Sequence, residues 1–271
     1  MTQKNKFNVI ITDLDGTLLN NKHLISNYTK TVFQELHHQN FLIIVATGRH
    51  HLDALPIIES LGAPAYLVTS NGARIHSPDK ELLFSFDIKS NVIQSVLSLE
   101  IDPEITTVLF KENVWQTNKY NEKLNSFQAE MHYLPEIVDF KTLEDLSAIK
   151  LFFSHENHQK LVALKDQIVS DHSDELHYAF SLPICLEFMD KSVDKSTAIA
   201  KILERENRSY EQAICFGDGF NDEKMLLQSH KGIIMKNAVE SLKNKLSHLE
   251  IIESNDDNGV AKYLYKEVLL D

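Results

Sequence analysis

The 271-residue sequence is poor in cysteine and has no long apolar run. Its two cysteines, Cys185 and Cys215, stand in apolar surroundings, which predicts buried thiols in a reducing compartment, without a disulfide or a zinc site. No apolar run approaches the roughly 20 residues that span a bilayer, and the first six residues show no signal-peptide pattern. We therefore expect a cytoplasmic protein without a membrane partner.

Positive charge is also scarce. Lys and Arg number 27 against 39 Asp and Glu, so the formal net charge is −12. This balance argues against nucleic acid or an anionic membrane surface as a partner, but an anionic substrate stays open because a bound metal can invert the local field. Residues 85–190 contain no arginine, and their 8 lysines against 18 Asp and Glu carry −10 of the charge, which we interpret as a solvated acidic surface.

Short apolar runs alternate with helical patterns toward both ends of the sequence. Strands are predicted at 9–12, 41–46, 66–68, 213–216, 231–235 and 249–252. Helices are predicted from Ser26 to Asn40, through Leu61 with a kink or break at Pro56, at 195–206 and 223–229, and from about Asn258. This alternation predicts an α/β fold with a doubly wound parallel sheet.

The alternation is interrupted in the middle of the chain. Strands at 106–110, 149–154 and 185–188 and a helix at 159–170 follow one another in mixed order. We therefore expect a core domain formed by residues 1–83 and 191–271, with an α+β domain of residues 84–190 inserted into it.

Two carboxylates follow the first strand. The run Val9–Thr12 is followed by Asp13 and Asp15, and in open α/β sheets ligands bind beyond the carboxyl ends of the strands. Two carboxylates at this spacing can share a hard cation such as Mg²⁺. A strand-end turn with solvated aspartates would give the same pattern, and this stretch alone does not distinguish the two.

Other strand ends carry side chains suited to the same chemistry. Phosphoryl transfer needs a nucleophile, a metal, donors for the phosphoryl oxygens and an acid for the leaving oxygen. Thr47 offers a hydroxyl, Gly48 permits close backbone approach, and Lys195 offers a positive charge at a helix start. Asp218 can hold Mg²⁺ together with the first strand's carboxylate, and Asp222 follows in the same loop.

Four stretches together resemble the motifs of the haloacid dehalogenase-like phosphohydrolases. They are Asp13-Leu14-Asp15-Gly16-Thr17, Thr47-Gly48-Arg49, Lys195, and Gly217-Asp218-Gly219-Phe220-Asn221-Asp222. Their order and spacing are similar to the Cof-type branch, which carries a large α/β cap domain between the second and third motifs. Asn71-Gly72 and Asn258-Gly259-Val260 also look like that branch.

The resemblance implies a role for each acidic residue of the first and fourth motifs. Asp13 would attack phosphorus, and Asp15 would protonate the leaving alcohol and then activate the hydrolytic water. Asp13, the backbone carbonyl of Asp15 and Asp218 would bind Mg²⁺. Asn221 and Asp222 would orient the metal and the motif lysine.

The resemblance also implies that Thr47 and Lys195 hold the phosphoryl oxygens. Ser196 stands where the family usually has glycine, which affects only the local geometry of the helix start.

Several neighbouring residues leave two interpretations open. Gly48, Arg49 and Asn71 are candidates for substrate binding, but Arg49 could instead bind the cap domain and Asn71 could be a turn former. His50 and His51 are expected to be exposed at a helix start, and Trp115 is expected to pack in a core; none of the 13 histidines lies in an HExxH pattern.

We expect an Mg²⁺-dependent phosphatase that acts on a small phosphate ester, with sugar phosphates favoured, as a monomer or weak homodimer. The alternatives are a phosphosugar mutase and a non-catalytic phosphoryl-accepting domain. A mutase needs a second phosphate site in the cap, which has no arginine for it. A receiver-like domain needs neither Asp15 nor a cap, and a glycosyltransferase DxD site would not explain Lys195 or the fourth motif.

Overall fold

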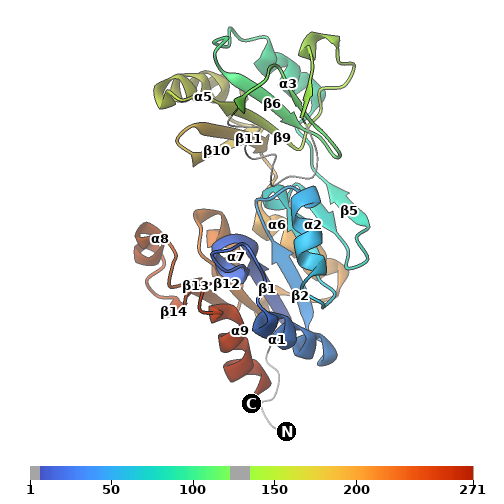
Figure 1. Ribbon diagram of the computed structural model, residues 1–271, viewed down its shortest axis with the longest axis vertical. Helices are drawn as coiled ribbons and strands as arrows, with labels where there is room; N and C mark the ends of the chain where they lie inside the picture. Colours follow the sequence, from blue (N-terminus) through green and yellow to red (C-terminus); the bar gives the residue numbers. More distant parts are fainter. Residues whose placement is uncertain (1–6, 123–134, 271) are drawn as a thin grey trace. The chain divides into compact units, whose positions relative to one another are not determined.

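The computed structural model describes residues 7–122 and 135–270, which fall into two units (Figure 1). The first unit comprises Met1–Ser85 and Asp194–Asp271, and the second comprises Phe86–Val193. The α/β fold with a parallel sheet and an inserted domain is confirmed.

An eight-stranded sheet forms the centre of the first unit. Its strands in chain order are β1 (Val9–Asp13), β2 (Leu42–Ala46), β3 (Tyr66–Thr69), β4 (Arg74–His76), β5 (Leu82–Ser85), β12 (Ala213–Gly217), β13 (Lys231–Met235) and β14 (Glu250–Ile252). The spatial order is β14-β13-β12-β1-β2-β3-β4-β5, in which the strands from β14 to β3 run parallel, β4 is antiparallel to β3, and β5 is antiparallel to β4. The strand β1 is therefore central.

The register of the central strands aligns the ends that carry the motifs. All five residues of β1 are buried, as its continuous apolar sequence predicts for a strand covered on both faces. Asp13 pairs with Ala46 of β2, and Thr12 pairs with Phe216 of β12. The residues that follow β2 and β12, including Thr47 and Asp218, consequently emerge beside the end of β1.

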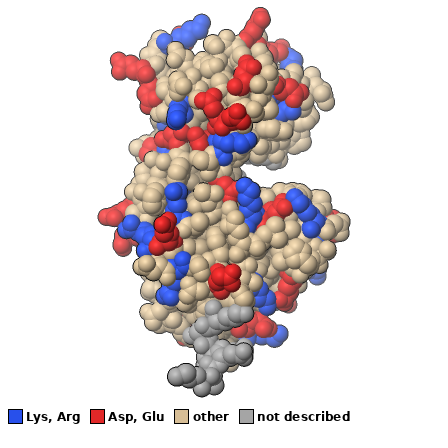
Figure 2. All heavy atoms as spheres, turned by 180° about the vertical axis from the view of Figure 1, so that it is seen from behind, with Lys and Arg blue, Asp and Glu red and all other residues tan. Residues whose placement is uncertain are grey.

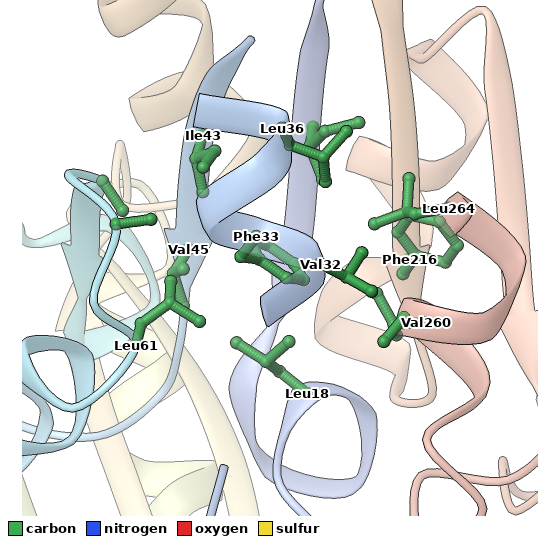
Figure 3. Close-up of a cluster of buried hydrophobic side chains, with 14 of the residues drawn as sticks. Leu18, Val32, Phe33, Leu36, Ile43, Val45, Leu61, Phe216, Val260 and Leu264 are labelled. Carbon is green, nitrogen blue, oxygen red and sulfur yellow. The ribbon is translucent and has the colours of Figure 1, made fainter. Parts of the chain in front are cut away.

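Helices cover both faces of this sheet. They are α1 (Asn27–His38), α2 (His51–Glu59), α6 (Lys195–Arg205), α7 (Glu223–Gln228), α8 (Glu240–Lys245) and α9 (Gly259–Leu264). On one face, Phe33 and Leu36 of α1 pack with Val260 of α9 and Phe216 of β12 (Figure 3). On the other face, Ile199 of α6 belongs to a second buried cluster with residues of α7 and α8.

Two local expectations for this unit are wrong. The break into two helices at Pro56 does not occur: Pro56 lies inside α2, because burial of Ala54 and Ile58 stabilises the helix despite the backbone hydrogen bond that proline cannot donate. His50 and His51 are buried instead of exposed, since the start of α2 packs against β4 and the rings of His51 and His76 lie 5.1 Å apart.

The second unit contains a sheet of its own. Its strands are β6 (Thr106–Phe110), β7 (Trp115–Thr117), β8 (Pro135–Ile137), β9 (Lys150–Ser154), β10 (Leu176–Leu182) and β11 (Cys185–Asp190), in the order β10-β11-β9-β6-β7-β8. Its helices include α3 (Ser90–Leu97) and α5 (His158–His172), which contribute to the buried cluster on the sheet. Trp115 is a packing residue, as expected: its ring is buried and stacks on Phe110.

The structure also shows where the two cysteines and the charged side chains lie. Cys185 and Cys215 are buried free thiols, and burial raises the pKa of Cys185 to about 11. On the face drawn in Figure 2, the acidic and basic side chains of the described residues are interspersed.

Among the helices of the described segments, none combines the length and apolar character that a membrane crossing requires.

Candidate functional site

A buried lysine joins two of the motif aspartates at the end of β1. The Nζ atom of Lys195 lies 2.6 Å from Oδ1 of Asp13 and 2.7 Å from Oδ1 of Asp222. The three side chains are 8% exposed or less. Lys195 is the first residue of α6, whose start is capped by the side chain of Asp194, so the departure at Ser196 leaves the helix start intact.

The second oxygen of Asp222 holds the loop that follows β12. Its Oδ2 atom accepts hydrogen bonds from the backbone N–H groups of Asp218, at 3.0 Å, and Gly219, at 2.9 Å. Both oxygens of Asp222 are thus engaged, one by the loop and one by Lys195. This aspartate fixes the positions of Asp218 and of the lysine ammonium, which is an orienting arrangement.

Asp218 is held from the opposite side by the first motif. Thr17 donates its hydroxyl to Oδ1 of Asp218 at 2.8 Å, a contact that no spacing in the sequence indicates although Thr17 lies within the first motif. One carboxylate oxygen from each of Asp13, Asp218 and Asp222 lies within 4.8 Å of the others. The structure therefore brings the predicted metal-binding carboxylates together.

This donor set fits a magnesium ion. Carboxylate oxygens are the ligands that Mg²⁺ prefers in proteins. When all three carboxylates are ionised, they and the ammonium carry a net charge of −2 in a buried place. One Mg²⁺ ion neutralises this charge. Asp13 and Asp218 are the two carboxylates available as ligands, since Asp222 is engaged as described.

The pKa values at this cluster reflect its burial. Burial raises the pKa of Asp218 to about 6, and burial together with the neighbouring Asp222 raises the pKa of Asp13, against the effect of Lys195. The pKa of Lys195 is raised as well: burial lowers it, but the facing charges of Asp13 and Asp222 prevail. A bound cation would favour the ionised form of both ligand aspartates.

Gly16 gives rise to the first prediction, because it has no room for a side chain. Its φ angle is +75°, and a Cβ atom would lie 2.3 Å from Oδ2 of Asp218. Gly16→Ala should lower the free energy of unfolding by about 1–3 kcal/mol through backbone strain. It should also displace Asp218 and weaken Mg²⁺ binding at least tenfold, as measured by titration calorimetry and thermal unfolding.

Gly62→Ala is the matched control for that variant. Gly62 has a similar φ of +70°, but its Cβ atom would meet only the flexible end of Gln34. It should lose stability without losing Mg²⁺ affinity. Equal magnesium affinity in Gly16→Ala and Gly62→Ala would contradict the placement of the metal beside Asp218.

The second motif forms a braced turn after β2. Thr47 is buried, its Oγ1 accepts the backbone N–H of Arg49 at 3.1 Å, and its carbonyl accepts the N–H of Asn71 at 3.0 Å. Asn71 has a left-handed φ of +56°, and its Oδ1 accepts a hydrogen bond from Asn221 at 3.0 Å. Asn71 is therefore both a turn former and a polar link between the second and fourth motifs, and a Cβ atom on Gly48 would lie 3.3 Å from its Oδ1.

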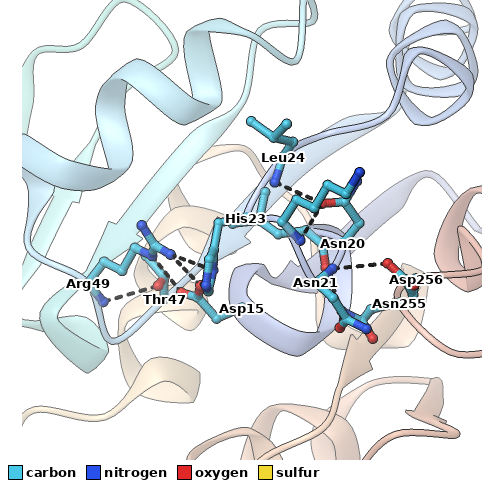
Figure 4. Close-up of polar contacts among 11 residues, drawn as sticks. Asp15, Asn20, Asn21, His23, Leu24, Thr47, Arg49, Asn255 and Asp256 are labelled. Carbon is cyan, nitrogen blue, oxygen red and sulfur yellow. Dashed lines mark hydrogen bonds and ion pairs between the residues drawn. The ribbon is translucent and has the colours of Figure 1, made fainter. Parts of the chain in front are cut away.

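Asp15 is separate from the carboxylate cluster and binds Arg49 (Figure 4). The Nε and Nη2 atoms of Arg49 lie 2.7 and 2.5 Å from the two oxygens of Asp15 in a bidentate pair. Neither sequence interpretation of Arg49 included this contact. Bidentate pairing fixes the carboxylate in orientation as well as in place.

A further residue at Asp15 was not identified from the sequence. Nδ1 of His23 lies 3.3 Å from Nη2 of Arg49 and 3.5 Å from Oδ1 of Asp15. His23 belongs to the loop between β1 and α1, where no motif or periodicity singles it out. Its left-handed backbone, with φ of +57°, is the local feature that sets it apart.

Comparison with known sequences gives one family and several curated relatives. Residues 10–264 match the family described as haloacid dehalogenase-like hydrolase. A protein of Buchnera aphidicola subsp. Baizongia pistaciae, named "Putative phosphatase", is 36% identical across 95% of this chain and 97% of its own length. An HMP-PP phosphatase of Cronobacter sakazakii is 31% identical across 93% of this chain and 92% of its own length.

Solved structures share the fold at lower identity. A haloacid dehalogenase-like hydrolase from Bacteroides thetaiotaomicron superposes with a TM-score of 0.84 at 23% identity and covers 96% of this chain and 99% of its own. A Thermotoga maritima protein gives 0.82 at 24% identity, over 96% of this chain and 97% of its own.

Proposed function

Because the chain belongs to the haloacid dehalogenase-like hydrolases and is a phosphatase, we propose that it hydrolyses small phosphate monoesters through an aspartyl-phosphate on Asp13. The observation that carries this proposal is the buried group of Asp13, Lys195 and Asp222 at the end of β1, with Asp218 beside it. The family match supports the reaction class, and the geometry supports the division of roles.

Asp13 is the proposed nucleophile. Its Oδ1 atom accepts a hydrogen bond from Lys195 at 2.6 Å and keeps a lone pair for the metal, which leaves the second oxygen for attack on phosphorus. Lys195 stays charged because its pKa is raised, so it stabilises the negative charge on the phosphoryl oxygens. Thr47, at the adjoining strand end, is proposed to donate its hydroxyl to the same oxygens.

Asp15 is the proposed general acid and base. It lies two residues after the nucleophile but has different partners, since Arg49 and His23 surround it while Lys195 faces Asp13. This difference in surroundings supports different roles for the two carboxylates. Asp15 would protonate the leaving alcohol and then deprotonate the water that attacks the aspartyl-phosphate.

Mg²⁺ is the proposed cofactor, held by Asp13, Asp218 and the backbone carbonyl of Asp15. When bound, it supplies charge neutralisation for the phosphoryl group. Thr17 and Asp222 position Asp218 for this task through the hydrogen bonds described above.

Chelation by EDTA should abolish hydrolysis of p-nitrophenyl phosphate, and Mg²⁺ should restore it. Because a ligand that binds only the folded state stabilises it, Mg²⁺ at 100 times its Kd should add about 2.7 kcal/mol to the free energy of unfolding. Asp218→Asn should lose this stabilisation, whereas unchanged stabilisation in that variant would remove Asp218 from the metal site.

Sugar phosphates are the proposed substrate class. The support is compositional: residues 85–190 are acidic and lack arginine, which disfavours a second phosphate or a nucleotide in the inserted unit. The name of the Cronobacter relative adds HMP-PP as a compound to test. A phosphate-release screen over sugar, nucleotide and cofactor phosphates, with HMP-PP included, tests the proposal, and turnover confined to nucleotides or diphosphates would contradict the sugar-phosphate assignment.

A further inference from the structure

His23 lies on a loop that is fixed by hydrogen bonds. The side chain of Asn20 accepts the backbone N–H groups of Lys22, at 3.0 Å, and Leu24, at 3.1 Å, and the Asn20 carbonyl accepts the N–H of His23 at 2.9 Å (Figure 4). This short closed loop holds His23 in its left-handed conformation.

Residues 19 and 21 tie this loop to the segment between β14 and α9. The N–H of Asn21 donates to Asp256 at 3.1 Å, and the buried side chain of Asn255 donates to the carbonyl of Leu19 at 2.8 Å and to Oδ1 of Asn21 at 3.2 Å. These hydrogen bonds fix the loop and with it the backbone position of His23, although the His23 side chain is 69% exposed.

The contact with Arg49 indicates which nitrogen of the neutral His23 ring carries the proton. A guanidinium group only donates hydrogen bonds, so Nδ1 of His23, 3.3 Å from Nη2 of Arg49, is the accepting nitrogen. The ring proton then lies on Nε2, at the opposite edge of the imidazole. His23 therefore offers an exposed hydrogen-bond donor beside Asp15.

We propose that His23 is a specificity-determining residue that donates a hydrogen bond to the leaving group of the substrate. The inference rests on the proposed function, in which Asp15 protonates the ester oxygen. Nδ1 of His23 is 3.5 Å from Oδ1 of Asp15, and Nε2 is on the other side of the same imidazole ring. A leaving group in contact with Asp15 therefore lies beside His23. The favoured class is a phosphate ester with a hydroxyl or carboxylate oxygen on the carbon next to the ester carbon.

The test compares two esters that differ only in this oxygen, 2-hydroxypropyl 1-phosphate and n-propyl phosphate. The wild type should have the higher kcat/KM for the hydroxypropyl ester. In His23→Asn the ratio of the two kcat/KM values should fall about tenfold, because one hydrogen bond to the leaving group is lost. Asparagine tolerates the left-handed backbone, so the loop should keep its conformation.

Lys22→Gln is the control, since it changes an exposed side chain of the same loop and should leave the ratio unchanged. A wild type without preference between the esters, an unchanged ratio in His23→Asn, or an equal loss on both esters would overturn the role of His23. Failure of the proposed function looks different: the wild type would then release phosphate from neither ester nor from any compound of the screen.

Discussion

Asp13→Asn should abolish phosphate release from p-nitrophenyl phosphate in the presence of Mg²⁺. The amide is a poor nucleophile, and it removes one charge from the metal site, so kcat should fall by roughly four orders of magnitude or more. Removal of the nucleophile also prevents formation of any phosphorylated protein. The measurement is continuous release of p-nitrophenol, with mass spectrometry of the intact protein after mixing with substrate.

The fold should survive this substitution. Lys195 keeps Asp222 as a partner at 2.7 Å, and loss of one carboxylate relieves repulsion within the group of Asp13, Asp218 and Asp222. Circular dichroism and thermal unfolding should therefore match the wild type closely. Asp166→Asn, an exposed change on α5, is the matched control and should keep full activity.

Substantial turnover by Asp13→Asn would show that Asp13 is not the nucleophile. The reaction would then need another attacking group, and a phosphorylated peptide that does not contain residue 13 would identify it.

How much of this site the sequence predicts depends on the regularity of each element. The strand β1 and its neighbours are buried on both faces, so continuous apolar runs reveal them, and parallel strands bring their carboxyl ends to one edge. The convergence of Asp13, Lys195 and Asp218 follows from that topology together with the motif resemblance. Their assigned roles remain proposals.

Short and polar elements cannot be predicted from the sequence in this way. The three residues of β4, Arg74-Ile75-His76, are too few for a period, and two of them are polar although all three are buried. In the same way, α2 continues through Pro56 because its tertiary packing outweighs a local signal.

The contacts around Asp15 cannot be predicted from the sequence for another reason. They depend on the rotamer of Arg49 and on the hydrogen-bonded loop that presents His23, and neither follows from spacing along the sequence. Only the structure therefore shows that Arg49 and His23 lie around Asp15.

Asp15→Asn should separate the two halves of the reaction. An amide can neither protonate the leaving group nor activate water, and loss of general acid–base catalysis costs about 10²–10⁴ in rate. With p-nitrophenyl phosphate the leaving group is acidic and departs without much assistance, so Asp13 should still be phosphorylated. Hydrolysis of the aspartyl-phosphate should then be the slow step, and mass spectrometry should detect a protein that carries one phosphoryl group.

Arg49→Gln controls for the loss of the bidentate pair. In Asp15→Asn the amide nitrogen faces a guanidinium that only donates, so part of the effect could come from displacement of Arg49. Arg49→Gln breaks the same pair but keeps the Asp15 carboxylate, so it should slow turnover less and should not accumulate phosphorylated protein. Accumulation in both variants would assign the effect to the position of Asp15, and wild-type turnover by Asp15→Asn would exclude this carboxylate as the acid and base.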